Sequence, residues 1–194
     1  MIRAHWARPA SIFLAGLMSG LMTACSQLPR TPEPPPYQAE PSAAHFEGRL
    51  AVRVDNDPKR SFSASFVLDG NARSGQLSLS TAMGTQVALA RWLPGRVWLV
   101  NGDGTREFDA LDQLSRETLG EDIPLVAFFD WLGARAWPDA PSRPLDNQAP
   151  GFQQMGWDVR LDRYADGLIV AQRQAPSSVS LRVKLDSVPL AVQP

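Results

Sequence analysis

Short stretches in which apolar and polar residues alternate recur along this chain. The clearest lie at 49–54, 61–68, 76–80 and 178–186. Successive side chains of a β-strand point to opposite faces, so this alternation is typical of strands with one buried face. Turn-forming residues at 55–58 and 69–71 separate the first three stretches. The pattern therefore predicts a mainly β fold.

The remaining segments complete a predicted element order of strands, a helical insert and further strands. Strands are expected at 85–92, with both faces apolar and covered, at 96–100 and at 105–108. Helices are expected at 109–119, capped by Asp109 and Gly120, and at 124–133, opened by Pro124 and ended by Gly133. A loop should follow at 136–149, then strands at 156–161, 167–172 and 178–186. Short connections favour antiparallel pairing.

The N-terminus has the composition of a secretory signal peptide at 1–24. Arg3 and Arg8 precede an apolar run at 11–22, and the small residues Thr23 and Ala24 lead into Cys25. The run is too short for a membrane span, which needs about 20 residues. Cys25 is the sole cysteine, and the alternative to a processed residue is an ordinary free or buried thiol.

A proline-rich segment at 25–43 predicts an extended tether ahead of a single domain at 44–190. At about 3 Å per residue, fifteen such residues would reach about 40 Å. A disordered linker is a compatible alternative. The formal net charge is −1, and loss of the two signal arginines makes it about −3, so nothing basic suggests nucleic acid.

Several segments, in this order, resemble the family of the outer-membrane lipoprotein receptor LolB. The matching residues are the first strand at 48–53, the hairpin at 77–85, the helical segments at 123–125 and 131–133, the strand at 152–159 with Tyr164, and the last strand at 183–185. The residues before Cys25 resemble a lipobox, with Met22 in the place of the usual leucine, which implies lipidation of Cys25. Ser26 after it fits transit to the outer membrane.

The resemblance implies a curved, incomplete antiparallel β-barrel with a helical lid over an apolar cavity. It implies a monomer without cofactor that accepts acylated lipoproteins from a LolA-type periplasmic carrier. The lipoproteins would then enter the phospholipid of the inner leaflet of the outer membrane. Charged residues would face the carrier, with Arg49, Arg53 and Arg160 as candidates.

Acyl chains need a large apolar concavity, because burial of apolar surface is non-directional. The candidate lining residues are Leu50, Val52, Phe62, Phe66, Leu77, Leu79, Leu89, Leu181 and Val183 from strands, and Phe128, Trp131 and Leu132 from the second helix. The alternative is a plain packed core. Met83 lies between two strands, and the resemblance assigns it to delivery of the lipoprotein into the membrane; otherwise it folds back onto the core.

Catalysis is not expected from these residues. His45 is the one histidine outside the signal segment, no Gly-x-Ser-x-Gly motif occurs, and no Cys or His pair has metal-ligand spacing. The main alternative function is a structural lipoprotein that assembles on the outer membrane and has a closed core. A secreted hydrolase would need a triad or metal site that the sequence does not offer.

Overall fold

The computed structural model describes residues 33–38, 43–119, 121–146 and 148–188. The predicted signal peptide at 1–24, Cys25 and Gly120 lie outside these ranges, as does most of the predicted tether. The statements about them therefore stay predictions. No helix in the described part of the chain is long and apolar enough to span a bilayer.

One antiparallel sheet of eleven strands forms the framework, with β1 near its centre and paired to both β2 and β11. The strand order is β6-β5-β4-β3-β2-β1-β11-β10-β9-β8-β7, and β6 and β7 end the described sheet without closing it. The strands are β1 (Ala44–Val54), β2 (Phe62–Gly70), β3 (Gly75–Ser80), β4 (Gln86–Leu93), β5 (Arg96–Asn101), β6 (Gly104–Phe108), β7 (Ser142–Pro144), β8 (Gly151–Gln154), β9 (Trp157–Arg160), β10 (Leu168–Arg173) and β11 (Val179–Leu185).

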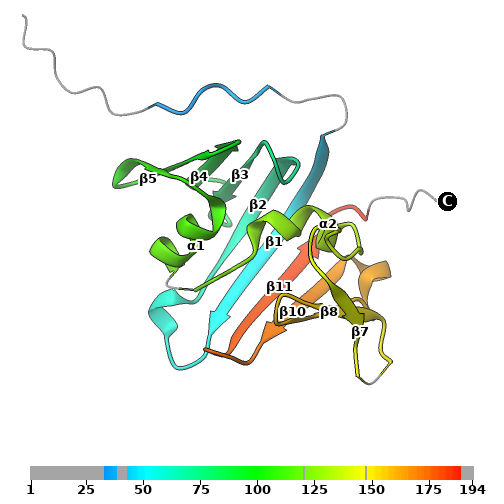
Figure 1. The fold of residues 1–194 in the computed structure, drawn as a ribbon. Coiled ribbons are helices and arrows are strands. Elements are labelled where there is room, and N and C mark those ends of the chain that lie inside the picture. Colours follow the sequence, from blue (N-terminus) through cyan, green and yellow to red (C-terminus); the bar gives the residue numbers. More distant parts are fainter. Residues whose placement is uncertain (1–32, 39–42, 120, 147, 189–194) are drawn as a thin grey trace, which may run out of the picture. The chain divides into compact units, whose positions relative to one another are not determined.

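Two helical segments cover one face of this sheet, as Figure 1 shows. Helix α1 spans Leu111–Leu119, and a short 3-10 turn, η2 (Leu125–Ala127), leads directly into α2 (Phe128–Leu132). Two further 3-10 turns, η1 (Pro58–Arg60) and η3 (Tyr164–Asp166), lie in connections between strands. The apolar sides of α1, η2 and α2 pack onto the inner side chains of the strands. The result is the expected curved, incomplete barrel with a helical lid.

The strand ends form two opposite margins of the sheet, which we call edges, and the register places each hairpin turn on one of them. The turns at 55–61, 81–85, 102–103, 155–156 and 174–178 lie on one edge, which we call the Met83 edge after the residue in the β3–β4 turn. The turns at 71–74, 94–95 and 161–167 lie on the other edge. This arrangement decides which surface residues lie near one another.

The helical insert differs in detail from the sequence prediction. Helix α1 begins at Leu111, two residues later than predicted, and the backbone N–H of Asp109 donates to Oε1 of Gln113. The predicted second helix is a 3-10 turn followed by a short α2, which ends at Gly133, before Ala134 with a φ of 57°. The apolar run was a correct signal for a buried element but a poor one for its length.

The strand prediction was also incomplete after the lid. The predicted loop at 136–149 contains β7, whose residues are all exposed and so carry no alternation. The predicted strand at 156–161 is confirmed as β9, whereas β8 at Gly151–Gln154 was not predicted as a separate strand; residues 155–156 are the turn that joins the two. Short edge strands of polar residues lack the signal that identified the others.

Candidate functional site

An apolar cavity of about 210 Å³ lies between the sheet and the helical segments. The strands supply most of its wall, and the lid supplies the rest. The lining residues are Leu50, Val52, Phe62, Leu77, Leu79, Val87, Ala88, Ala90, Leu99, Asn101, Leu114, Thr118, Ile123, Leu125, Phe128 and Leu181. Only Asn101 and Thr118 in this set have polar side chains, so the space suits an aliphatic ligand rather than a polar one.

Strand register explains why these side chains converge. Val52 lies between Phe62 of β2 and Leu181 of β11, while Leu77 and Leu79 oppose Ala90 and Ala88 of β4. Each of these pairs lies on the inner face, because side chains of directly opposed residues share a face. The two alanines have short side chains, and they leave space that larger residues would fill.

A β-bulge in β4 brings one additional residue to the wall. Leu79 pairs with Ala88 and Ser80 pairs with Gln86, so Val87 has no partner across the strand pair. A bulge places two consecutive residues opposite one and re-aims a side chain. Val87 and Ala88 therefore both line the cavity although they are neighbours in sequence. Val87 was not among the predicted lining residues; Leu89 was chosen from this strand instead, which is apolar on both faces.

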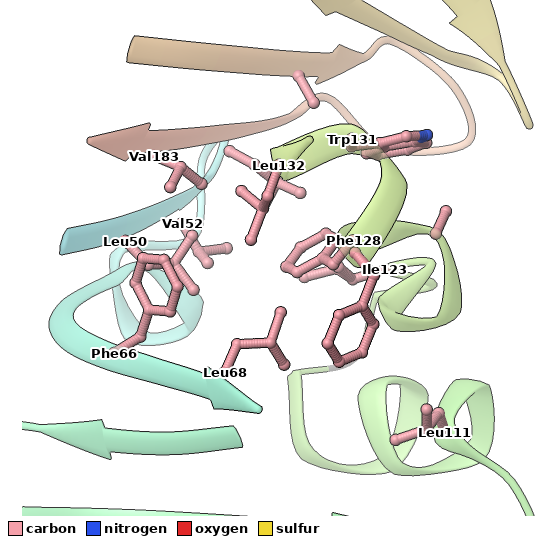
Figure 2. Close-up of a cluster of buried hydrophobic side chains, with 14 of the residues drawn as sticks. Leu50, Val52, Phe66, Leu68, Leu111, Ile123, Phe128, Trp131, Leu132 and Val183 are labelled. Carbon is pink, nitrogen blue, oxygen red and sulfur yellow. The ribbon is translucent and has the colours of Figure 1, made fainter. Parts of the chain in front are cut away.

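The lid closes the cavity from the side opposite the strands. Figure 2 shows Leu50, Val52 and Phe66 pointing from the sheet toward Phe128 and Leu132 of the lid. Phe66 and Leu132 line a smaller space next to the main cavity, and Leu50 lies at the wall of both. Ile123, which the sequence analysis did not select, is 1% exposed and reaches the cavity from the segment before η2.

Buried polar contacts hold the C-terminal end of the lid. Nε1 of Trp131 donates to Oε1 of Gln154 at 2.8 Å, and Gln154 is only 1% exposed. The hydroxyl of Tyr164 donates to the carbonyl of Leu132 at 3.0 Å, and burial raises the pKa of this hydroxyl. Both contacts tie α2 to the β8–β10 part of the sheet.

A buried carboxylate holds the other end of the lid, ahead of η2. Oε1 of Glu121 accepts a hydrogen bond from Nη1 of Arg60 at 2.9 Å, and its Oε2 accepts from Nη2 of Arg173 and from the Ser177 hydroxyl, each at 2.5 Å. Glu121 and Arg173 are 4% and 6% exposed. Arg60 also donates to Asp57, and this hydrogen bond lowers the pKa of the Asp57 carboxyl. We call Arg60, Glu121, Arg173 and Ser177 the Glu121 latch.

The predicted lining residues divide into four groups. Seven lie at the wall of the main cavity: Leu50, Val52, Phe62, Leu77, Leu79, Phe128 and Leu181. Phe66 and Leu132 lie at the adjoining smaller space. Trp131 and Val183 are buried in the core, away from both spaces. Leu89 was placed on the wrong face, because it opposes Ser78 while its neighbours Ala88 and Ala90 line the cavity.

The β3–β4 turn projects an apolar side chain into solvent next to the cavity. Met83 is 94% exposed, so it does not fold back onto the core. The N–H of Thr81 donates to the carbonyl of Thr85 at 2.8 Å and the N–H of Gly84 to that of Thr81 at 2.9 Å, which closes the turn beneath Met83. Val87 is 44% exposed and also lines the cavity, so the apolar wall continues to the surface toward this turn.

The candidate residues for carrier binding lie on the outer face of the sheet. Arg49 opposes Lys184, and Arg53 opposes Ser180, across β1 and β11, and both arginines are exposed. Arg160 lies on β9, 3.5 Å from Asp162. Among the described residues, no group of three or more His, Cys, Asp or Glu is placed to hold a metal ion.

Comparison with known proteins gives one consistent result. A family model described as "Outer membrane lipoprotein LolB" matches residues 43–193. The chain is 33% identical to "Outer-membrane lipoprotein LolB" of Bordetella petrii over 174 residues, which cover 84% of this chain and 85% of that protein. Proteins of the same name from Bordetella pertussis and a Marinomonas species are 29% and 26% identical, over 89% and 86% of this chain and 88% and 90% of their own lengths.

Proposed function

Since this chain belongs to the LolB family of outer-membrane lipoproteins, we propose that it receives acylated lipoproteins in its cavity and passes them into the outer membrane. The observation that carries this function is the apolar cavity between sheet and lid, whose wall continues to the surface beside Met83. Its lining has the aliphatic character that acyl chains require. Cys25 would carry the lipid anchor that keeps the domain at the periplasmic side of the membrane.

Transfer into the cavity requires no covalent chemistry. Each buried methylene of an acyl chain contributes about 0.8 kcal/mol, whichever apolar surface covers it. A chain therefore moves from a carrier to this protein when this cavity buries it better, and about 1.4 kcal/mol of difference gives a tenfold preference. The donor would be a LolA-type periplasmic carrier, and the protein would act as a monomeric acceptor rather than an enzyme.

The alternative of a structural lipoprotein with a closed core has less support. A closed core would fill the space between Ala88, Ala90 and Phe128 with side chains, whereas these residues line an open volume. The walls also differ from ordinary core in that Val87 and Phe62 are only partly buried. Both features favour a site that takes up a ligand.

A transfer assay tests the proposed function. A soluble form that begins at Ser26 is mixed with purified carrier loaded with radiolabelled lipoprotein, and the label is followed by co-precipitation. We expect the label to move to this protein and to be competed by free fatty acid. Label that stays on a functional carrier, while circular dichroism shows the acceptor to be folded, would reject the acceptor function.

We further propose that Met83 contacts the bilayer when the lipoprotein leaves the cavity. Met83→Glu should abolish delivery to vesicles, because a carboxylate at this turn would have to enter the apolar phase uncompensated. Acceptance from the carrier and the unfolding midpoint should stay unchanged, since the side chain is exposed. Met83→Leu should deliver normally, and Leu93→Glu places the same charge on the opposite edge as a control. Loss of acceptance in Met83→Glu would refute a role confined to delivery.

A further inference from the structure

The turn between β8 and β9 contains a residue that its backbone does not favour. Gln154 pairs with Trp157, so Met155 and Gly156 alone form the turn. Their φ angles are 53° and 79°. Two-residue hairpin turns with positive φ at both positions favour Asn, Asp or Gly at the first position. A methionine there has the steric cost of the left-handed conformation and no side-chain hydrogen bond to offset it.

Burial does not explain this methionine either. The side chain of Met155 is 46% exposed. It is one of the four large exposed apolar residues in the described part of the chain, with Met83, Val87 and Leu93. Single exposed apolar residues are common on protein surfaces, whereas several that lie together indicate an interaction site. The position of Met155 relative to the other three therefore decides whether it belongs to such a site.

Three of these four residues lie on one edge of the sheet. Trp157, the first residue of β9, lies beside the C-terminal end of β10. Arg173 at that end of β10 opposes Val179 of β11, and Val179 opposes Val54 at the C-terminal end of β1. Met155 therefore lies on the same edge as the turn that follows β1 and the β3–β4 turn with Met83. Val87 is the second residue of β4, near this edge, and it lines the cavity. Leu93 lies on the other edge, beside the 94–95 turn.

We propose that Met155 makes a second contact with the bilayer, on the Met83 edge but far from Met83. Its side chain would enter the boundary between the lipid head groups and the acyl chains. The proposal builds on the proposed function, in which a lipid-anchored domain delivers its ligand beside Met83. A single apolar contact leaves the domain free to rotate about the β3–β4 turn. A second contact, six strands away in the sheet order, fixes the rotation and holds the cavity wall at Val87 toward the membrane.

Methionine suits this contact better than a residue preferred by the turn. Its unbranched, polarizable side chain adapts to an irregular apolar environment. Asn, Asp and Gly would relieve the backbone but would give the lipid no apolar surface. The sequence thus places an apolar side chain at the first position of this two-residue turn.

A site-specific dye tests the contact directly. Cys25 is the sole cysteine, and under the proposed function it would be acylated in the mature chain and unable to react with thiol reagents. Met155→Cys, Met83→Cys and Leu93→Cys each then supply one thiol for an environment-sensitive fluorophore, with the wild-type chain as the labelling control. In vesicles of phosphatidylethanolamine and phosphatidylglycerol, we expect a several-fold rise and a blue shift of emission at positions 155 and 83, quenched by brominated acyl chains. Position 93 should not respond.

Each other outcome overturns the proposal in a recognisable way. A response at position 83 without one at 155 removes the second contact and leaves the proposed function intact. Silence at both positions removes the second contact together with the bilayer role of Met83. A response at 155 that appears only when carrier protein is added, without quenching by brominated lipid, would make the turn a protein contact instead.

Met155→Asn separates the function of the side chain from its effect on folding. Asn-Gly is favoured in this turn, so the unfolding midpoint should stay equal or rise. Delivery from the loaded protein to vesicles should slow several-fold, while acceptance from the carrier stays unchanged. Leu93→Asn removes a side chain of similar exposure, 43%, from the other edge and should deliver normally. Unchanged delivery by Met155→Asn would overturn the proposal.

Discussion

At the scale of single residues, Gln154 is the polar side chain on which the lid depends. Its Oε1 accepts from Trp131 Nε1 at 2.8 Å and from the N–H of Trp137 at 2.9 Å, and its Nε2 donates to the carbonyls of Trp137 and Ala140 at 2.7 and 2.8 Å. All four hydrogen-bonding positions of the amide are used. A buried amide is tolerated only when it is satisfied in this way, so Gln154 fixes α2 and the segment after it in one geometry.

Gln154→Met keeps the volume of this side chain and removes its hydrogen bonds. The indole N–H of Trp131 and the backbone groups of Trp137 and Ala140 would then lack their partner, which should lower the free energy of unfolding by about 2–4 kcal/mol. Urea unfolding measures this change. Gln153→Met is the control, because its amide bonds the side chains of Arg143 and Asp158 at the surface side of the same strand and should cost much less. Equal losses of unfolding free energy in the two variants would show that the buried hydrogen bonds of Gln154 do not hold the lid.

The limits of sequence reasoning are clearest for residues near the cavity. Alternation assigns a residue to a face, and this succeeded for Leu50, Val52 and Leu181, which the structure places at the wall. It gives no answer for β4, which is apolar on both faces, so Leu89 was chosen and the small residues Ala88 and Ala90 on the opposite face were missed. Trp131 was expected to cover the cavity because it is large and apolar; its hydrogen bond to Gln154 holds it in the core instead.

At the scale of elements, the lid is attached at two ends by different kinds of contact. The C-terminal end depends on Gln154 and Tyr164, whereas the N-terminal end depends on the Glu121 latch. Through Glu121, the latch joins the lid to η1 after β1 and to the end of β10. Arg173 adds a hydrogen bond to the carbonyl of Asp122 at 2.8 Å and stacks its guanidinium 5.1 Å from the Trp157 ring.

Glu121→Gln keeps the shape of the latch and removes its negative charge. Arg173 would then be a buried cation without a counter-charge, and breaking a buried pair in this way costs about 3–5 kcal/mol. We expect lower stability in urea and faster hydrogen exchange along 121–127 than along α2. Asp122→Asn is the matched control, because its carboxylate is exposed and 3.8 Å from Arg116. Slower or unchanged exchange in Glu121→Gln would show that the latch does not hold this end of the lid.

The elements themselves were predictable to the extent that they carry a periodic signal. The strands from β1 to β6 and the last strand, β11, alternate or run apolar, and each was expected at its place. The bulge in β4 and the exposed strand β7 follow from pairing with partners elsewhere in the chain. Such long-range pairing leaves no mark in the local sequence.

At the scale of the whole domain, the sheet and lid enclose space that a fold optimised for stability would fill. Apolar walls that do not touch one another lack dispersion contacts, so the free energy of unfolding is lower than in a fully packed domain. Proteins commonly retain such costs at functional sites, and filling them commonly stabilises the fold while removing activity. The cavity beside Ala88 and Ala90 fits this description, and it gives the family assignment a physical consequence that can be measured.

Ala88→Phe therefore distinguishes an acceptor with a real cavity from a lipoprotein with a closed core. In the cavity, the ring occupies empty apolar space, so the free energy of unfolding should stay equal or rise by about 1 kcal/mol, while acceptance of lipoprotein falls at least tenfold. In a closed core the same ring would overpack its surroundings and cost about 1–3 kcal/mol. Leu89→Phe is the control on the outer face of the same strand and should leave both properties unchanged. Urea unfolding measures the stability of both variants, and the transfer assay measures their acceptance of lipoprotein. A destabilised Ala88→Phe that still accepts lipoprotein would contradict the placement of the ligand in this cavity.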